Sequence, residues 1–230
     1  MSDIFKLYQL VFDSRKHLLE MIEDRGYDVS HLKDYNSDDI KTMLIEHKTG
    51  KFVSLPDIGP LDILLEKNVG TSNYEKIYIK YRQDHKIKKT AGLIAQITDI
   101  YDKHLSTKDT LIILNIYRVL IKPGVKDKTD EEFGNTMFIT NNYFVQLFGL
   151  ENFLMNVSKH QFVPKHRLLS KTEMQELLAK FNCNGKNIPT IKRDDAQAKY
   201  IGLRPKQICE IIAQNVSSGN IERYRLCVSN

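Results

Sequence analysis

The feature that most constrains the fold is a continuous apolar run, TLIILNIYRVL, at residues 110–120. Such a run is too short to span a bilayer and is typical of a strand buried on both faces of a sheet. A helical pattern precedes it at residues 90–105, and the alternating segment YEKIYIKY precedes that helix at residues 74–81. Strand, helix and buried strand in this order predict a parallel β-α-β unit, and therefore an α/β fold.

The remaining N-terminal patterns extend this unit to a domain covering residues 1–150. Apolar residues recur at helical spacing from residue 2 to about residue 25, where Gly26 supplies a helix end. A second helix is predicted after Ser37, with two aspartates in its first turn. The segment NNYFVQLFG, at residues 141–149, is interpreted as a short helix stopped by glycine.

A second domain is predicted at residues 151–230. NFLMNVS indicates a strand, and a helix follows Ser170. An extended NIPTIKR segment leads to one helical turn that Asp194 or Asp195 caps and Gly202 ends. RPKQ, at residues 204–207, is typical of a type I turn, and residues 208–213 and 221–228 predict a hairpin. The order β-α-β-α-β-β describes a small two-layer α/β domain.

Several polar residues have both a structural and a reactive interpretation. Ser170 and Glu173 fit the capping box of a helix N-terminus, which we favour over an acid–base role for Glu173. His160 and His166 lack the i, i+4 spacing of a zinc-binding pair, so structural roles are favoured. The three cysteines form no CxxC pair, and we expect free thiols, no metal and no other cofactor.

The only enzyme-like pattern is that of a metal-dependent nuclease. Asp57 follows a proline, and Asp84 and Lys86 follow at a distance, as in restriction-type nucleases where carboxylates hold Mg²⁺ and a lysine assists water. A pattern of four loosely spaced residues often arises by chance. A free nuclease therefore stands as the alternative function.

Charge is unevenly distributed along a chain of net charge +5. Residues 76–128 hold 12 Lys or Arg against 5 Asp or Glu, a difference of +7, and include Lys122, Lys126 and Lys128. On the last strand, Arg223 and Arg225 alternate with a tyrosine. Both features suit binding of nucleic acid through phosphates and stacking, but a solvated loop and an ordinary edge strand have the same composition.

Three long stretches of the C-terminal domain carry a family resemblance. HQFVPKHRLLSKTEMQELLAKF, IPTIKRDDAQAKYIGLRPKQICEII and SSGNIERYRLCV resemble the C-terminal module of the fifth shared subunit of eukaryotic nuclear RNA polymerases, a module that stands alone in archaeal polymerases. The likeness covers roughly residues 153–228 without an evident gap. LLEMIEDRGY, near the N-terminus, is similar to the start of the eukaryotic subunit.

This resemblance implies a non-catalytic subunit of DNA-directed RNA polymerase. It implies that the C-terminal domain docks on the largest subunit, and that the N-terminal domain is a jaw with a nuclease-like core lying near downstream duplex DNA. It implies no membrane partner and an intracellular location, in the nucleus for a cellular protein or in a cytoplasmic factory or virion for a viral one. The residues matched to the family's landmarks, and expected at the assembly surface, are His160, Pro164, His166, Arg193, Asp194, Tyr200, Gly202, Arg204, Tyr224 and Arg225.

The sequence also departs from the family pattern at informative places. Asp195 stands where the family usually has proline, and the triplet Arg204-Pro205-Lys206 stands where it usually has a basic residue followed by Arg-Gly. Asn220 replaces an arginine at the hairpin, which puts a phosphate or partner contact there in doubt. The family's DNA-proximal Thr-Pro-Ser-Ala loop has no clear copy. By element order alone, residues 122–128 are its nearest candidate.

Overall fold

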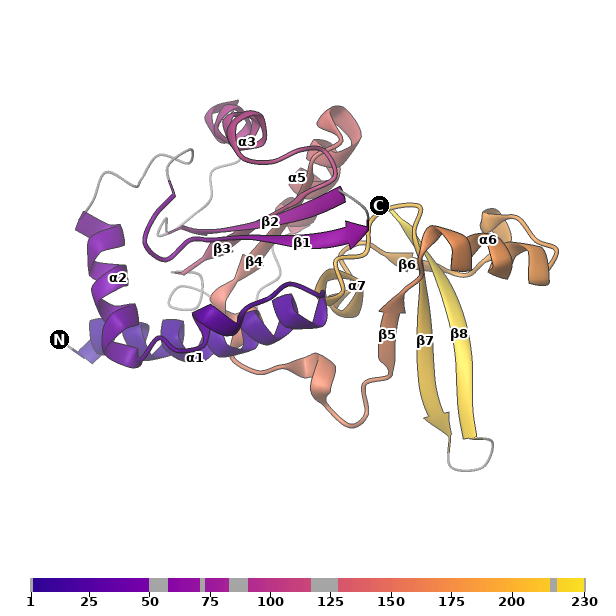
Figure 1. The fold of residues 1–230 in the computed structure, drawn as a ribbon, viewed down its shortest axis with the longest axis horizontal. Helices are drawn as coiled ribbons and strands as arrows, with labels where there is room; N and C mark the ends of the chain where they lie inside the picture. Colours follow the sequence, from indigo (N-terminus) through magenta and orange to yellow (C-terminus); the bar gives the residue numbers. More distant parts are fainter. Residues whose placement is uncertain are drawn as a thin grey trace. The chain divides into compact units, whose positions relative to one another are not determined.

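The computed structural model describes residues 2–49, 58–70, 73–82, 91–116, 128–215 and 219–229, which form two compact units divided between Met155 and Asn156 (Figure 1). The sequence places this boundary slightly earlier, after residue 150. The segment just beyond that point stays with the N-terminal unit, because the Phe153 ring lies 5.2 Å from the Phe148 ring.

The N-terminal unit is built on one four-stranded sheet. Its strands lie in the order β1 (Ile63–Gly70), β2 (Asn73–Arg82), β3 (Thr110–Asn115) and β4 (Phe144–Gly149). β1 and β2 form an antiparallel pair, whereas β2, β3 and β4 run parallel to one another. The predicted parallel β-α-β unit is therefore confirmed, with α3 (Ala91–Lys103) as its helix.

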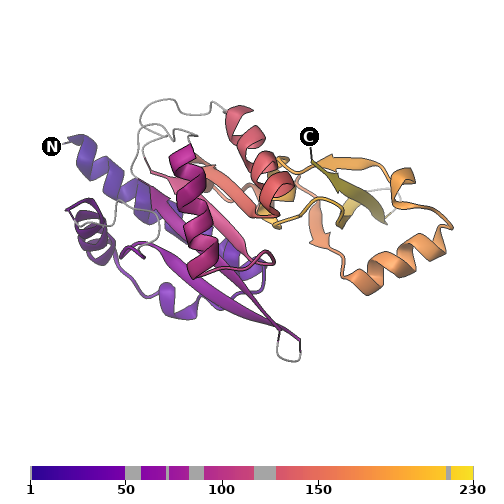
Figure 2. The same cartoon turned by 90° about the horizontal axis from the view of Figure 1, so that it is seen from above.

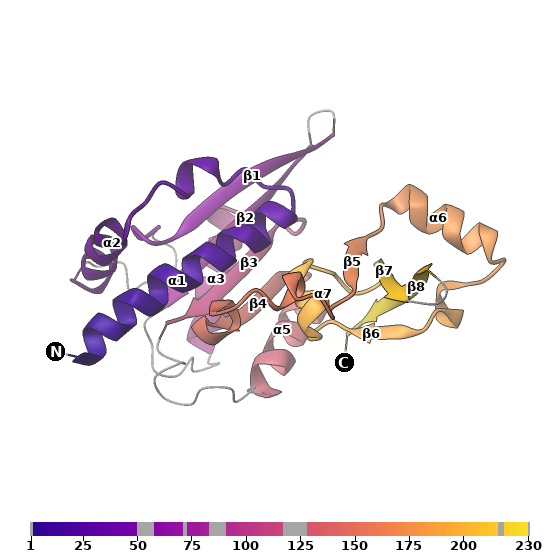
Figure 3. The ribbon, with the colours of Figure 1, turned by 90° about the horizontal axis from the view of Figure 1, so that it is seen from below.

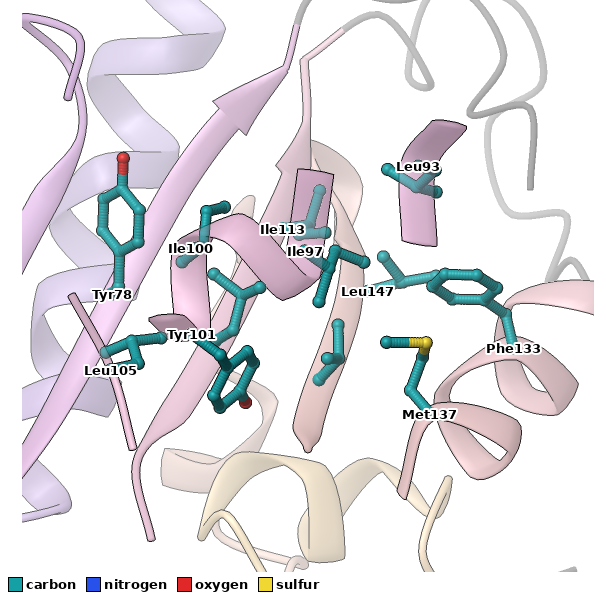
Figure 4. Packing of buried hydrophobic residues seen from close by; sticks show 12 residues of the cluster. Tyr78, Leu93, Ile97, Ile100, Tyr101, Leu105, Ile113, Phe133, Met137 and Leu147 are labelled. Carbon is teal, nitrogen blue, oxygen red and sulfur yellow. The ribbon is translucent and has the colours of Figure 1, made fainter. Parts of the chain in front are cut away.

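Helices cover both faces of this sheet. α3 and α5 (Lys128–Asn141) lie on one face, and α1 (Ser2–Asp24) lies on the other (Figures 2 and 3). Successive side chains of β4 point to opposite faces of the sheet. Val145 and Leu147 pack against α3 and α5 on one face. On the other face, Gln146 accepts a hydrogen bond at 3.0 Å from Arg25, which follows the end of α1. Figure 4 shows the apolar core under α3 and α5. Its buried residues are Tyr78, Leu93, Ile97, Ile100, Tyr101, Leu105, Leu111, Ile113, Phe133, Met137, Val145 and Leu147.

Two smaller helical elements complete the described part of this unit. The 3-10 helix η1 (Ser30–Leu32) precedes α2 (Ser37–Thr49), which begins where the sequence predicts it. Gly26 has a φ of 87° after α1, as expected for a helix-ending glycine. Within the described residues, none of the helices combines the length and apolar character needed to cross a bilayer.

The short helix predicted at residues 141–149 is wrong. Asn142 has a φ of 57° and follows the end of α5, and residues 144–149 form the strand β4 instead. All six residues of β4 are buried, although β4 is the edge strand beside β3, because helices cover both faces of the sheet there. α5 and β1 were not predicted from the sequence.

The C-terminal unit contains a second four-stranded sheet. Its order is β5 (Lys165–Leu168), β7 (Ile208–Asn215), β8 (Gly219–Val228) and β6 (Thr190–Lys192). The predicted hairpin is confirmed as β7 and β8, and β6 pairs parallel to β8. The strand predicted at NFLMNVS is wrong, because this segment forms two 3-10 helices, η2 (Leu150–Phe153) and η3 (Val157–Lys159). The first strand is β5, so the order β-α-β-α-β-β holds with a later start.

The layering of this unit differs from the predicted two layers. α6 (Lys171–Lys180) packs on the sheet face that carries Ile208 and Leu226, whereas α7 (Ala196–Tyr200) packs on the face that carries Cys209 and Cys227. Successive residues of a strand point to opposite faces, so the two helices cover opposite sides. The class remains α/β, with a helix on each face of the sheet.

The caps and turns at the ends of these elements agree with the sequence predictions, except for the type of one turn. Asp195 rather than Asp194 caps α7, by accepting from the Gln197 and Ala198 amides, and Gly202 follows with a φ of 68°. The turn at residues 204–207 is closed by a bond from the Gln207 N–H to the Arg204 carbonyl. Lys206 has a φ of 72° at the third position of this turn, which is the type II rather than the predicted type I conformation.

Candidate functional site

The residues predicted at an assembly surface fall into three groups within the C-terminal unit. The first surrounds the start of β5, the second surrounds α7 and the third lies on β8. In that order, the groups are His160, Pro164 and His166; Arg193, Asp194, Tyr200, Gly202 and Arg204; and Tyr224 and Arg225.

The first group shapes the chain between η3 and β5. The exposed His160 closes η3, since its N–H donates to the Val157 carbonyl and its own carbonyl accepts from Val163 at 2.9 Å. His166 Nδ1 lies 2.8 Å from the Pro164 carbonyl oxygen, which accepts when Nδ1 carries the proton. His160 Nδ1 accepts a hydrogen bond from the Phe162 N–H at 3.3 Å. Both histidine rings therefore contact backbone groups two residues away, in keeping with structural roles.

The second group joins α7 to the edges of the sheet. Arg193 is 3% exposed, and its N–H donates to the Val228 carbonyl at 3.1 Å. The Tyr200 hydroxyl accepts from the Asn156 amide at 3.1 Å. The Arg204 N–H donates to the Gln207 side chain at 2.8 Å. These contacts fix the backbone around α7, where Asp194, Tyr200 and Arg204 are half-buried.

The third group reveals a charged network that sequence reasoning missed. Arg167 on β5 donates to Glu210 on β7 at 2.9 Å and to Glu173 on α6 at 2.6 Å. The register explains this contact, because Arg167, Glu210 and Tyr224 lie in one row across three strands. The Tyr224 hydroxyl donates toward Glu210 at 3.3 Å. Only the strand pairing brings these side chains together, and no local motif marks it.

The electrostatics of the network follow from its partners. The Ser170 amide and the Arg167 guanidinium lower the pKa of Glu173 to about 2, while the two carboxylates raise the pKa of Arg167. Burial and the neighbouring Glu222 raise the pKa of Tyr224 to about 12. Glu173 also completes the capping box at Ser170, so its predicted role as a cap is confirmed.

The other face of the same strands is basic. Arg223 lies opposite Ile211, which lies opposite His166, and Arg225 lies opposite Cys209. Both arginines are on the side of β8 away from Tyr224, as the alternation predicts. Cys209 and Cys227 lie in the apolar cluster on this face, and burial raises their thiol pKa values to about 11 and about 12.

The residues of the nuclease hypothesis lie outside the described part of the chain. Asp57, Asp84 and Lys86 fall in the gaps at residues 50–57 and 83–90, as Lys122 and Lys126 fall in the gap at residues 117–127. Lys128 is the first residue of α5. Within the ranges that are described, no group of three His, Cys, Asp or Glu side chains is placed to hold a metal ion.

Residues 155–227 match the family of the RNA polymerase Rpb5 C-terminal domain. The matched stretch runs from the segment before η3 to the last residues of β8, and so includes all three groups of predicted assembly residues. The family resemblance stated from the sequence is confirmed.

Similarity extends along the chain beyond the Rpb5 C-terminal domain. A Caenorhabditis elegans protein named DNA-directed RNA polymerases I, II, and III subunit RPABC1 is 25% identical over 99% of both chains. Its Dictyostelium discoideum counterpart is 26% identical over 99% of this chain and 100% of its own length. Subunit 5B of the Arabidopsis thaliana RNA polymerases IV and V is 27% identical over 94% of this chain and 88% of its own.

Proposed function

We propose that this protein is a non-catalytic subunit of a DNA-directed RNA polymerase. The observation that carries the proposal is the end-to-end similarity to polymerase subunits of three organisms, which begins near the N-terminus and includes the Rpb5 C-terminal domain. No comparison favours the nuclease alternative.

The Rpb5 C-terminal domain is proposed to dock on the largest polymerase subunit. Its four-stranded sheet supports this role, because side chains that are already positioned lose less conformational entropy on binding. The basic face of β8, with Arg223 and Arg225, and the half-buried segment around α7 offer charged and polar groups for that contact. Tyr200 and Arg204 belong to the second of these surfaces.

The N-terminal unit is proposed to lie near downstream duplex DNA in the assembled enzyme. The support is the net charge of +7 over residues 76–128, which contain 12 Lys or Arg and 5 Asp or Glu. Lys122, Lys126 and Lys128 would contact phosphates without reading bases, so the contact would weaken as salt rises. Replacing all three with glutamate should shorten the lifetime of elongation complexes at low salt. An unchanged lifetime across a salt series would remove these lysines from the proposal.

The location of the protein in the cell would depend on whether a cellular organism or a virus encodes it. In a cellular organism the protein would work in the nucleus, and in a large DNA virus it would work in a cytoplasmic factory or the virion.

Affinity purification of the tagged protein from its native source tests the function. We expect the two largest polymerase subunits to co-purify in stoichiometric amounts. A protein that purifies alone, and that cleaves DNA with Mg²⁺ in a manner abolished by Asp84→Ala, would replace this proposal with the nuclease.

A further inference from the structure

Over more than half of its length, the outer edge of strand β8 has no partner strand among the described residues. β6 pairs with β8 only at Leu226–Val228. β7 covers the inner edge of β8 without a bulge from Gly219 to Leu226. Among the described residues, none therefore pairs with the outer edge of residues 219–225.

The backbone groups that point outward at this edge can be assigned by parity. The Leu226 N–H donates outward to the Pro189 carbonyl at 2.9 Å, and the Val228 carbonyl accepts from Arg193 at 3.1 Å. Cys227, between them, bonds inward on the β7 side. Since direction alternates along a strand, the N–H and C=O groups of Glu222 and Tyr224 point outward.

The side chains beside these groups carry a charge pattern on one face. Arg223 and Arg225 share the face opposite Tyr224, two residues apart. Neither guanidinium forms a hydrogen bond or ion pair with a described residue, in contrast to Arg167 on the other face. A strand added at this edge would place alternate side chains next to the two arginines, where carboxylates are complementary.

A second copy of the chain fits this edge poorly in the registers centred on residues 222 to 224. Antiparallel self-pairing centred on Arg223 places that arginine opposite itself, and centring on Tyr224 places Arg223 opposite Arg225. Centring on Glu222 places two glutamates opposite each other. Like charges directly opposite destabilise a strand pair, so these three registers are disfavoured.

Nucleic acid also fits poorly. A row of backbone donors and acceptors is complementary to another polypeptide, and Glu210 and Glu222 place carboxylates beside the Tyr224 hydroxyl on the second face.

We propose that the outer edge of β8 at residues 222–225 binds an extended segment of another polymerase subunit, which adds a strand to the sheet and sets carboxylates at alternate positions beside Arg223 and Arg225. This inference rests on the proposed function and specifies how one surface of the domain would bind. Main-chain bonds to Glu222 and Tyr224 would supply affinity, and the arginines would select the partner.

Pairs of variants test the backbone and the charges separately, in the full-length protein purified with its polymerase. Glu222→Pro removes an outward N–H and should reduce the retained large subunits about fivefold or more, the value of one lost hydrogen bond. Glu222→Ala, which keeps the N–H, should retain them. Arg223→Glu should also weaken retention, whereas Lys171→Glu, the same charge change on exposed α6, should not.

A photo-crosslinking residue in place of Glu222 tests the edge without relying on the proline variant folding. We expect a crosslink to an extended, acidic segment of a polymerase subunit, mapped by mass spectrometry. A crosslink to DNA, to RNA or to a second copy, or no crosslink in the purified complex, would overturn the inference. If the unmodified protein fails to co-purify with polymerase, the proposed function and this inference fall together. If it does co-purify but the crosslink goes elsewhere, only the inference fails.

Discussion

Gly202 ends α7 with a φ of 68°, a conformation that strains any residue with a branched Cβ. Gly202→Val should therefore lower the free energy of unfolding by about 1 kcal/mol or more. Urea denaturation of the full-length protein measures this change. Gly185→Ala is the matched control, because a Cβ there meets no atom within 4 Å and its φ is not positive. Equal stabilities of the two variants would contradict the argument.

Glu173 gives the protein a defined acid sensitivity. Its pKa in the folded state is about 2, below the ordinary value of 4.5, because the Ser170 amide and Arg167 favour the charged form. A lowered folded pKa contributes stability above the unfolded pKa, and this contribution is lost as pH falls from about 4.5 to about 2.

Glu173→Gln should therefore lower Tm at pH 7, and the difference should shrink to a small remainder at pH 2, where the folded-state carboxyl is about half protonated. Thermal denaturation followed by circular dichroism at a series of pH values tests this. Glu176→Gln, at an exposed position on the same helix, serves as the control. A Glu173→Gln deficit that persists unchanged at pH 2 would show that lost packing, rather than charge, is responsible.

At the scale of elements, a buried ion pair connects the chain just before β1 to the C-terminal end of β2. Lys80 Nζ lies 2.7 Å from Asp62 Oδ2, with side chains 2% and 0% exposed. The same carboxylate accepts from the Gly59 and Tyr81 amides. Removing one partner of such a pair leaves the other charge buried without compensation.

Lys80→Met should therefore destabilise the protein by about 3 kcal/mol. Lys76→Met, on the same strand but in an exposed pair with Glu66 at 2.9 Å, should cost less than about 1 kcal/mol. Adding Asp62→Asn to Lys80→Met should cost less than the sum of the two single changes. Chemical denaturation of these variants gives the comparison. Additive losses would show that the two side chains act independently.

The elements differ in how far local patterns specify them. α1 and the helix after Ser170 combine helical spacing with a recognisable end, so both their existence and one of their limits follow from neighbouring residues, whereas α3 follows from helical spacing alone. The run FVQLF in β4 has no period that separates a buried strand from a buried helix. Pairing with β3 decides its conformation, and this partner lies about thirty residues away in sequence.

At the scale of the molecule, residues 156–230 have their own sheet and two apolar clusters. We predict that this unit folds alone, as the resemblance to the free-standing archaeal module implies. A polypeptide of these residues should give a dispersed proton NMR spectrum and a cooperative thermal transition. A collapsed amide region without methyl signals shifted by ring currents would show that it needs the rest of the chain.

Sequence alone determined the α/β class, the parallel β-α-β unit, the C-terminal hairpin, the helix caps and the resemblance to polymerase subunits, because each is encoded by residues close together or by long matching stretches. Tertiary structure alone decided that α6 and α7 cover opposite faces, that residues 144–149 form a strand, and that Arg167, Glu210 and Tyr224 meet in one row. The outer edge of β8, which has no described partner at residues 219–225, also emerged only from strand order. These features depend on which strands pair and in which register, and pairing between distant residues is set by the packing of the whole unit rather than by any local pattern.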